Sequence, residues 1–342
     1  MILAGGLSTR LYPLTKSVPK PLVPVAGVPN AIHLMRYLKA FGFDEIVINT
    51  HYLADAIAQT LGDGSEYGVR LQYSYEPELL GSAGGLKKVE SFFDDGPFLV
   101  IGCDEVTDIP LDKVLAFHRD REAIATIGLV ECEEVDQYGV VVLGDRGKIV
   151  GFQEKPAKGT ERSKLANTGV YFFSPEIFNR IPADEFYDFG KQVFPALQSA
   201  GEAFYGFDAQ GAYWSDIGTP SEYRRASYDV IRGVVRIPQT RADGIDASAK
   251  LGSDVRIEGP VRIGAAVRIE DGAAIVGPSV LDDGVCVRSG ALLERSIVWQ
   301  DSTIGPGATL RDTVVGRDYD VAGGVTLDDT LVATDGVQTS RV

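Results

Sequence analysis

One aliphatic position recurs about every six residues through the last third of the chain, from Leu251 to Leu327. An α-helix has a period of 3.6 residues and a strand a period of two, so neither element accounts for the series. A six-residue period is typical of a left-handed parallel β-helix, whose flat walls each turn one aliphatic side chain into a narrow core. The recurring residues are Leu251, Ile257, Ile263, Ile269, Ile275, Leu281, Val287, Leu293, Val298, Ile304, Leu310, Val315, Val321 and Leu327. Three such steps close one coil, so residues 251–332 provide about four to five coils.

The residues before this repeat alternate short apolar runs with helical patterns. The runs that predict buried strands cover residues 46–48, 69–71, 98–101 and 125–130. The patterns that predict helices cover residues 31–41, 53–61 and 111–118. This alternation predicts an α/β fold with a Rossmann-like mixed, mostly parallel sheet and helices on both faces, followed by the β-helix. We therefore divide the chain into domains at 1–236 and 237–333 and a tail at 334–342.

Charge and composition limit the partners of the chain. The net charge is −15 over 342 residues, and this argues against a nucleic-acid partner, which needs a basic surface. No apolar run reaches the roughly 18 residues of a membrane span and no secretion signal is evident, so we expect no membrane contact and a cytoplasmic location. The three cysteines are far apart and lack metal-site spacing, which favours reduced thiols.

The first 25 residues carry the groups suited to a phosphate ligand. An apolar run enters a Gly-Gly loop, where glycine lets the backbone approach a ligand and offer N–H groups to phosphate oxygens. Arg10 adds a planar charged fork, and Lys20 lies between two prolines that fix the backbone on either side. A Gly-Gly loop alone is most often an ordinary turn. The prediction of a phosphate ligand therefore depends on the whole 25-residue string.

This string resembles the nucleotidyltransferase signature of sugar-nucleotide pyrophosphorylases, L-A-G-G-x-G-T-R-L-x-P-L-T…P-K-P, with Ser8 in place of the usual third glycine. These enzymes transfer a nucleoside monophosphate from an NTP to a sugar 1-phosphate, so the resemblance implies that activity, those two partners, and residues 1–236 as the catalytic domain. The nucleotide contacts that it implies here are Leu3, Ala4, Gly5, Gly6, Ser8, Thr9 and Arg10. The chain begins unusually close to the motif, so we expect a short first strand or further residues before Met1.

Two further strings match the family. Residues 76–85 are similar to its E-x-x-L-G-T-A-G segment, which implies that Glu78, Gly81 and Ser82 contact the base or ribose. Asp104 and Asp216 match the family's metal-binding aspartates, and two carboxylates suit Mg²⁺ completed by substrate phosphates. An isolated aspartate is more often a turn or helix cap. The resemblance implies Arg10, Lys20 and Asp104 as the catalytic residues.

The sugar-phosphate side rests on a predicted hairpin of residues 140–143 and 148–152 and on the strand that follows it. A surface ion pair is the ordinary interpretation of Glu154-Lys155, but their neighbours match the family, in which the glutamate accepts sugar hydroxyls and the lysine binds the phosphate. The predicted sugar-phosphate contacts are Gly139, Glu154, Lys155, Asn167 and Gly169.

Several alternatives stay open. The strings are most similar to mannose-1-phosphate guanylyltransferases, so GTP and mannose 1-phosphate are the first expectation. Glucose-1-phosphate thymidylyl-, uridylyl- and adenylyltransferases share most of the same residues. A non-catalytic sugar-nucleotide-binding homologue is less compatible with the presence of Arg10, Lys20, Asp104 and Asp216. An acyltransferase β-helix would use a histidine base, and no histidine follows His118. We expect the β-helix to assemble the protein into a homo-oligomer.

Overall fold

The computed structural model describes residues 1–238 and 243–339, and its contacts divide the chain into two units. Unit 1 comprises Met1–Gly6 and Leu34–Ser215, and unit 2 comprises Leu7–His33 and Asp216–Val342. The segment 7–33 therefore groups with the β-helix, although the sequence-based division placed it in the α/β domain. The predicted tail 334–342 contains a strand, and its last residues, 340–342, lie outside the described residues, as do residues 239–242 near the predicted domain boundary.

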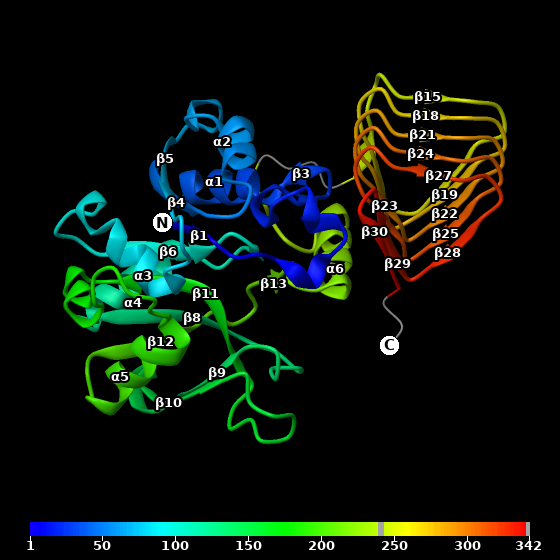
Figure 1. The fold of residues 1–342 in the computed structure, drawn as a ribbon. Coiled ribbons are helices and arrows are strands. Elements are labelled where there is room, and N and C mark those ends of the chain that lie inside the picture. Colours follow the sequence, from blue (N-terminus) through cyan, green and yellow to red (C-terminus); the bar gives the residue numbers. More distant parts are fainter. Residues whose placement is uncertain (239–242, 340–342) are drawn as a thin grey trace. The chain divides into compact units, whose positions relative to one another are not determined.

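Unit 1 is built on a nine-stranded sheet with the order β10-β9-β11-β6-β1-β4-β5, and β8 and β12 extend it from β11 (Figure 1). Its strands are β1 (Ile2–Ala4), β4 (Glu45–Thr50), β5 (Arg70–Tyr75), β6 (Phe98–Gly102), β8 (Ala125–Glu131), β9 (Gly139–Leu143), β10 (Ile149–Glu154), β11 (Leu165–Phe173) and β12 (Phe204–Asp208). β4 and β6 flank β1 in parallel, and β11 runs antiparallel to β6. The predicted Rossmann-like mixed sheet is confirmed.

Helices connect these strands. They are α1 (Asn30–Ala40), which crosses from unit 2 into unit 1, α2 (Ala54–Leu61), α3 (Gly81–Lys88), α4 (Leu111–Asp120) and α5 (Phe194–Ser199), with short helical turns η4 (Ser65–Tyr67), η5 (Glu90–Phe92), η6 (Asp145–Gly147), η7 (Pro175–Arg180) and η8 (Phe189–Val193). A two-stranded sheet pairs β7 (Glu105–Thr107) with β13 (Trp214–Asp216). The core is rich in aromatic side chains, and Phe194 stacks on Phe189 and on Phe204.

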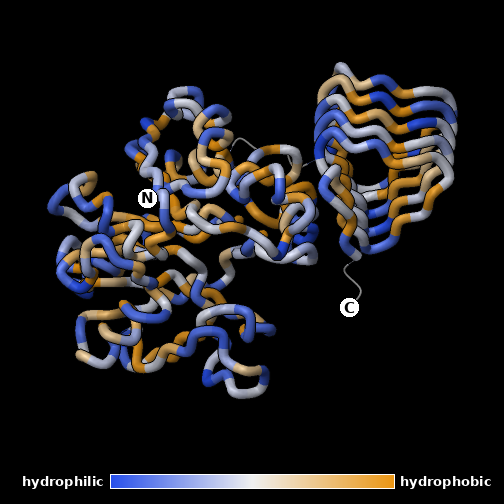
Figure 2. The backbone as a smooth tube through the Cα atoms, viewed as in Figure 1, coloured by the Kyte–Doolittle hydropathy of each residue, from blue (hydrophilic) through white to orange (hydrophobic). Residues whose placement is uncertain are grey.

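Unit 2 contains a parallel β-helix with three walls, in which hydrophobic and hydrophilic residues alternate along the coils (Figure 2). The first wall is β14 (Gly244–Ile245), β17 (Val261–Ile263), β20 (Ser279–Leu281), β23 (Ile297–Val298), β26 (Val314–Val315), β29 (Thr330–Ala333) and the antiparallel β30 (Gly336–Thr339). The second wall is β15 (Lys250–Leu251), β18 (Arg268–Ile269), β21 (Cys286–Val287), β24 (Thr303–Ile304) and β27 (Asp320–Val321). The third wall is β16 (Arg256–Glu258), β19 (Ala274–Val276), β22 (Leu292–Glu294), β25 (Thr309–Arg311) and β28 (Thr326–Asp328).

The prediction of six-residue repeats is confirmed in register. Every member of the periodic series lies in one of these strands, and each pairs with the member one coil away, as Leu251 does with Ile269 and Ile269 with Val287. Most of the series forms one buried aliphatic core.

The remaining elements of unit 2 are the helix α6 (Pro220–Ile231), the turns η1 (Thr9–Leu11), η2 (Leu14–Lys16) and η3 (Lys20–Leu22), and the hairpin of β2 (Pro24–Val25) and β3 (Val28–Pro29). α6 begins after Thr219, whose hydroxyl accepts a hydrogen bond from the Glu222 amide. Across the described residues, every helix falls short of the length and apolar character that a membrane span requires.

Candidate functional site

A cavity of about 230 Å³ opens in unit 1 where β1 and β4 end. Its walls are formed by Leu3, Gly5, Gly6, Asn49, Glu76, Leu79, Gly81, Ser82 and Phe186. In open α/β sheets, ligands bind at the carboxyl ends of the strands, which is the edge occupied by this cavity. The Gly-Gly loop and the segment that follows β5, which lie far apart in sequence, therefore form one site.

Two buried polar side chains hold the cavity walls together. The Asn49 amide donates to Glu76 Oε1 at 2.8 Å, and its Oδ1 accepts from the Ala4 amide at 2.8 Å. Glu76 Oε2 accepts from the Leu80 amide at 3.2 Å. A Cβ on Gly5 would lie 3.1 Å from the Asn49 amide nitrogen, so the loop backbone packs tightly against this pair.

The segment 76–85 contributes Gly81 and Ser82 to the cavity, as the sequence analysis expects of nucleotide contacts, while Glu78 is exposed and does not line it. Gly81 has a φ of 74°, and a Cβ there would come 2.5 Å from the Tyr187 carbonyl. This position therefore requires glycine. Glu76 was not singled out from the sequence, and only its place at the start of a family-like string could have indicated it.

The Ser82 hydroxyl connects the cavity to a pair of carboxylates. It donates to Asp188 Oδ2 at 2.9 Å and accepts from the Phe189 amide. Asp188 in turn accepts from the amides of Gly190 and Lys191. Glu154 approaches the same turn, because a Cβ on Gly190 would lie 2.6 Å from its Oε2. Asp188 is a site residue that sequence reasoning missed.

Two of the predicted sugar-phosphate residues, Gly139 and Asn167, lie close to Glu154, whereas Gly169 packs against Glu105. A Cβ on Gly139 would lie 3.3 Å from both Glu154 Oε2 and Asn167 Cβ. The Asn167 side chain donates to the Tyr171 hydroxyl and accepts from the Gly169 amide. Partial burial of the Glu154 carboxylate disfavours its charged form and raises its pKa. The nearby positive charge of Lys155 lowers the pKa, but by less. Lys155 follows β10 with a φ of 45°.

Asp104 follows β6 in unit 1, and its Oδ1 would lie 2.9 Å from a Cβ on Gly102. Its neighbour Glu105 is buried and accepts a hydrogen bond from the Trp214 indole at 2.7 Å. Glu105 was not singled out from the sequence, where the only signal for it was the rare pair of acids at the end of a buried strand.

Unit 2 contains three of the predicted site residues, Arg10, Lys20 and Asp216. The side chains of Arg10 and Asp216 meet at Gly218. A Cβ on Gly218 would lie 2.6 Å from Asp216 Oδ2 and 2.7 Å from Arg10 Nη2, so both charged groups press against the same glycine. Ser8 precedes them with a φ of 54°. The left-handed conformation explains why the family most often has glycine at this position.

The metal prediction pairs Asp104 of unit 1 with Asp216 of unit 2, and this pairing stays a prediction. Over residues 1–238 and 243–339 no group of three or more His, Cys, Asp or Glu is arranged to hold a metal ion. The predicted Mg²⁺ site needs only two carboxylates, because substrate phosphates and water complete the coordination. Both aspartates offer the hard oxygen donors that Mg²⁺ prefers.

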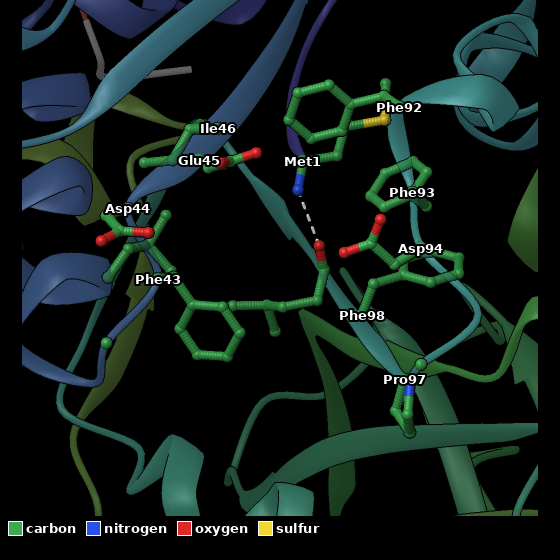
Figure 3. A pocket seen from close by; sticks show the side chains of 14 residues that line it. Met1, Phe43, Asp44, Glu45, Ile46, Phe92, Phe93, Asp94, Pro97 and Phe98 are labelled. Atoms are coloured by element: carbon green, nitrogen blue, oxygen red, sulfur yellow. Dashed lines mark hydrogen bonds between the residues drawn. The ribbon is translucent and has the colours of Figure 1, made fainter.

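A larger hollow of about 360 Å³ lies at the opposite edge of the sheet, where β4 and β6 begin (Figure 3). Phe43, Phe92, Phe93 and Phe98 line it together with the acidic Asp44, Glu45 and Asp94. The Met1 amino group donates to the Leu99 carbonyl at 2.7 Å. The acidic side chains of this hollow repel anions, and the hollow lies at the amino ends of the strands. The smaller cavity is therefore the candidate for a phosphate-bearing ligand.

Comparison with known proteins finds relatives that are named as sugar-1-phosphate nucleotidyltransferases. UTP–glucose-1-phosphate uridylyltransferase of Synechocystis is 39% identical over 331 residues, which cover 90% of this chain and 84% of that protein. Mannose-1-phosphate guanylyltransferase of Mycobacterium tuberculosis is 33% identical over 242 residues, 70% of this chain and 67% of that protein. The crystal structure of HddC from Yersinia pseudotuberculosis superposes with a TM-score of 0.58 at 29% identity and covers 66% of this chain and 96% of that one.

Two family models cover most of the sequence. The GMPPB C-terminal domain matches residues 242–339, the part that contains the β-helix. The nucleotidyl transferase family matches residues 1–233, which include the Gly-Gly loop, the cavity and the carboxylate pair. The chain belongs to the nucleotidyl transferase family.

Proposed function

We propose that this protein transfers a nucleoside monophosphate from an NTP to a sugar 1-phosphate and releases pyrophosphate. One observation carries the proposal: Ser82 lines the glycine-walled cavity and also donates to Asp188 of the carboxylate pair. A cavity with close backbone approach suits a nucleoside and its phosphates. Adjacent carboxylates suit the hydroxyl groups of a sugar, which donate hydrogen bonds to them. The two halves of the product thus have adjoining sites.

The reaction needs no covalent intermediate. A phosphate oxygen of the sugar 1-phosphate forms a bond to the α-phosphorus of the NTP, and the bond from that phosphorus to the oxygen bridging to the β-phosphate breaks. The electron pair leaves with pyrophosphate, and no proton is transferred. Catalysis then consists of holding the two substrates in line and of neutralising charge on the phosphates.

We assign Arg10 and Lys20 to the triphosphate and Lys155 to the sugar phosphate. A chain of net charge −15 repels both substrates at long range, so these cations act locally, inside the site. We propose that Asp104 and Asp216 hold Mg²⁺, which when bound supplies further neutralisation of phosphate charge.

GTP with mannose 1-phosphate is the first substrate pair that we propose. The sequence strings favour it, and the match of the GMPPB C-terminal domain supports it. UTP with glucose 1-phosphate is the second candidate, because the Synechocystis uridylyltransferase matches over 90% of this chain at 39% identity. Backbone groups of the cavity loops read the base, and such contacts depend on no particular side chain.

A matrix of assays tests the proposal. Pyrophosphate release is measured for GTP, UTP, dTTP and ATP, each with mannose 1-phosphate and with glucose 1-phosphate, in the presence of Mg²⁺. We expect one pair to be turned over at least about tenfold faster than the others, since each 1.4 kcal/mol of differential binding gives that ratio. Tight binding of NDP-sugars without turnover of any pair would favour the non-catalytic homologue.

We also propose that the protein forms a homo-oligomer through the first coil of the β-helix. Ile245 and Leu251 are 43% and 46% exposed, although Leu251 occupies an inward position whose counterpart one coil later, Ile269, is 1% exposed. A coil end with exposed aliphatic residues, and with strand edges that pair with no other described strand, is suited to burial against another copy. Light scattering tests this, and a Leu251→Glu variant is expected to shift the protein towards monomer.

A further inference from the structure

The first wall of the β-helix has aliphatic residues on both of its faces. Its inward residues belong to the periodic core. From β20 onward the residues directly before them point outward, yet they are also buried: Val280, Ile297, Val314 and Leu331. Arg262 holds the same position one coil earlier, in β17. The second wall carries Lys250, Arg268, Cys286, Thr303 and Asp320 at the equivalent outward positions. A wall with two apolar faces is one that packs against something on its outside.

Within unit 2, α6 and the segment 7–33 contact this wall. Arg224 of α6 forms an ion pair with Asp329 at 2.7 Å, and the Tyr228 hydroxyl donates to the Arg295 carbonyl. The Lys16 ammonium donates to the Asp335 carbonyl at 3.1 Å. Arg295 and Asp329 lie at the corner between the third wall and the first wall, and Asp335 lies between β29 and β30 of the first wall. The segment 7–33, which carries Arg10 and Lys20, thus contacts the β-helix directly through Lys16.

A relay of two hydrogen bonds connects the β-helix to the segment 7–33, which carries Lys20. The indole N–H of Trp299, directly after β23, donates to the Tyr223 hydroxyl at 2.8 Å. The Tyr223 hydroxyl donates to the Pro24 carbonyl at 2.7 Å. Both side chains are almost fully buried, at 2% and 0% exposed, and their rings meet edge to face. Burial keeps the pKa of Tyr223 well above its usual range, so its hydroxyl retains the proton that it donates.

Pro24 is one of three successive residues whose carbonyls are held. The Val23 carbonyl accepts from the Asn30 amide at 3.1 Å, and the Val25 carbonyl accepts from the His33 ring at 2.9 Å. The Val23 amide donates back to the Lys20 carbonyl at 3.1 Å. Of these anchors, only the one at Pro24 reaches outside the segment, to α6 and from there to the β-helix.

We propose that Trp299 is a positioning residue for the transfer reaction, fixing through Tyr223 the segment that places Lys20 on the triphosphate. This inference rests on the proposed function. It gives the β-helix a role in catalysis besides assembly. Displacement of a phosphate-binding group by about 1 Å is enough to slow such a reaction strongly, and the relay restrains that displacement.

Trp299→Phe keeps an aromatic ring and removes the N–H donor, and Tyr223→Phe removes the hydroxyl. With the fastest NTP and sugar 1-phosphate pair of the wild type, we expect either change to lower kcat/KM for the NTP by roughly tenfold. The KM for the sugar 1-phosphate stays unchanged, because its contacts lie in unit 1. The double variant loses no more than Tyr223→Phe alone, since Trp299 acts through Tyr223.

Tyr319→Phe is the matched control, because it removes an aromatic hydroxyl next to β27 of the second wall, away from the relay. We expect it to leave the kinetics unchanged. Amide hydrogen exchange across residues 20–30 gives a readout independent of activity. We expect about tenfold faster exchange in Trp299→Phe and wild-type exchange in the control. If Trp299→Phe does not fold, Tyr223→Phe carries the same test.

The outcomes separate the two proposals. Unchanged exchange across residues 20–30 in both folded relay variants overturns the positioning role, as does a KM for the sugar 1-phosphate that rises about tenfold in them. A wild-type protein that turns over no substrate pair refutes the proposed function instead, while its exchange data still show whether Trp299 fixes the segment.

Discussion

The Trp214 indole donates to Glu105 Oε2 at 2.7 Å across 109 residues of sequence, and it also donates to the Thr168 carbonyl at 2.9 Å. The other carboxylate oxygen of Glu105 lies against Gly169, where a Cβ would approach it to 2.2 Å. One buried acid therefore ties the strand after Asp104 to the strand that carries Asn167 and to the strand that leads to Asp216.

Gly169→Ala tests this arrangement. Gly169 has a φ of 72°, so alanine is strained there and also collides with the Glu105 carboxylate. We expect a loss of at least about 3 kcal/mol in the free energy of unfolding, from the left-handed conformation and from overpacking together. Urea unfolding measures it.

Gly159→Ala is the matched control, because Gly159 has a φ of 84° but no atom within 4 Å of the place that an alanine methyl group would take. It has the strained conformation without the collision, so we expect a loss of about 1 kcal/mol. Equal losses of unfolding free energy in the two variants would show that the Glu105 side chain moves aside without destabilising the protein.

Ser8 provides a second test of backbone conformation. Its φ of 54° is left-handed, and its buried hydroxyl has no hydrogen-bond partner among the described residues. Ser8→Gly relieves the conformation, and we expect a gain of about 0.5 to 1 kcal/mol in unfolding free energy. Thermal unfolding measures it.

Ser8→Ala separates the hydroxyl from the backbone, because it keeps the strained conformation and removes only the oxygen. We expect little change in stability and a several-fold weaker affinity for the NTP, as for loss of one hydrogen bond worth about 1 kcal/mol. Unchanged NTP affinity would show that the hydroxyl does not contact phosphate.

Arg10→Ala removes the guanidinium next to Gly218, and we expect turnover to fall by at least about a hundredfold, as for loss of a group that stabilises developing charge. Arg70→Ala is the control, because Arg70 pairs with Glu45 on the exposed amino-terminal side of β5 and β4. Pyrophosphate release compares them. Loss of activity in both variants, or in neither, would contradict the role of Arg10.

The six-residue series predicted the β-helix because a repeating coil imposes the same inward position on every turn. Leu281 and Val298 could be placed in the core from spacing alone, and both are fully buried. The outward Val280 and Ile297 gave a second signal, because aliphatic doublets occur in four successive strands of the first wall, β20, β23, β26 and β29. The prediction of the β-helix rested on the inward series alone and did not use these doublets.

The site was predictable where the family strings are continuous and not where distant segments meet. Gly81 and Ser82 were found because they follow a recognisable string, and they line the cavity. Asp188 was missed because its place beside Ser82 depends on how η8 packs against α3, over 100 residues away. Glu76 was missed for a related reason: its function in the cavity wall depends on Asn49, which belongs to another strand.

His118 predicts how stability depends on pH. The ring is buried between two hydroxyls, with Nδ1 facing Thr126 at 2.9 Å and Nε2 facing Ser174 at 3.0 Å. The Ser174 hydroxyl donates to the Ala123 carbonyl, so it accepts from Nε2, and Nδ1 is left as the acceptor for Thr126. Burial accordingly lowers the pKa of His118 to about 4 from its ordinary 6.5.

Between pH 6.5 and about 4 the unfolded chain binds a proton at this residue that the folded chain does not. The free energy of unfolding therefore falls as the pH drops through this window, by at most about 3 kcal/mol from this group, and stops falling below it. Urea unfolding at pH 7.5 and pH 4.5 measures the fall. We expect the His118→Gln variant to lose the share of this fall that His118 causes. The His51→Gln variant keeps the full fall, because His118 is still present. An equal fall in the wild type and His118→Gln would mean that His118 is protonated in the folded protein at pH 4.5 at no cost to its two hydroxyl contacts.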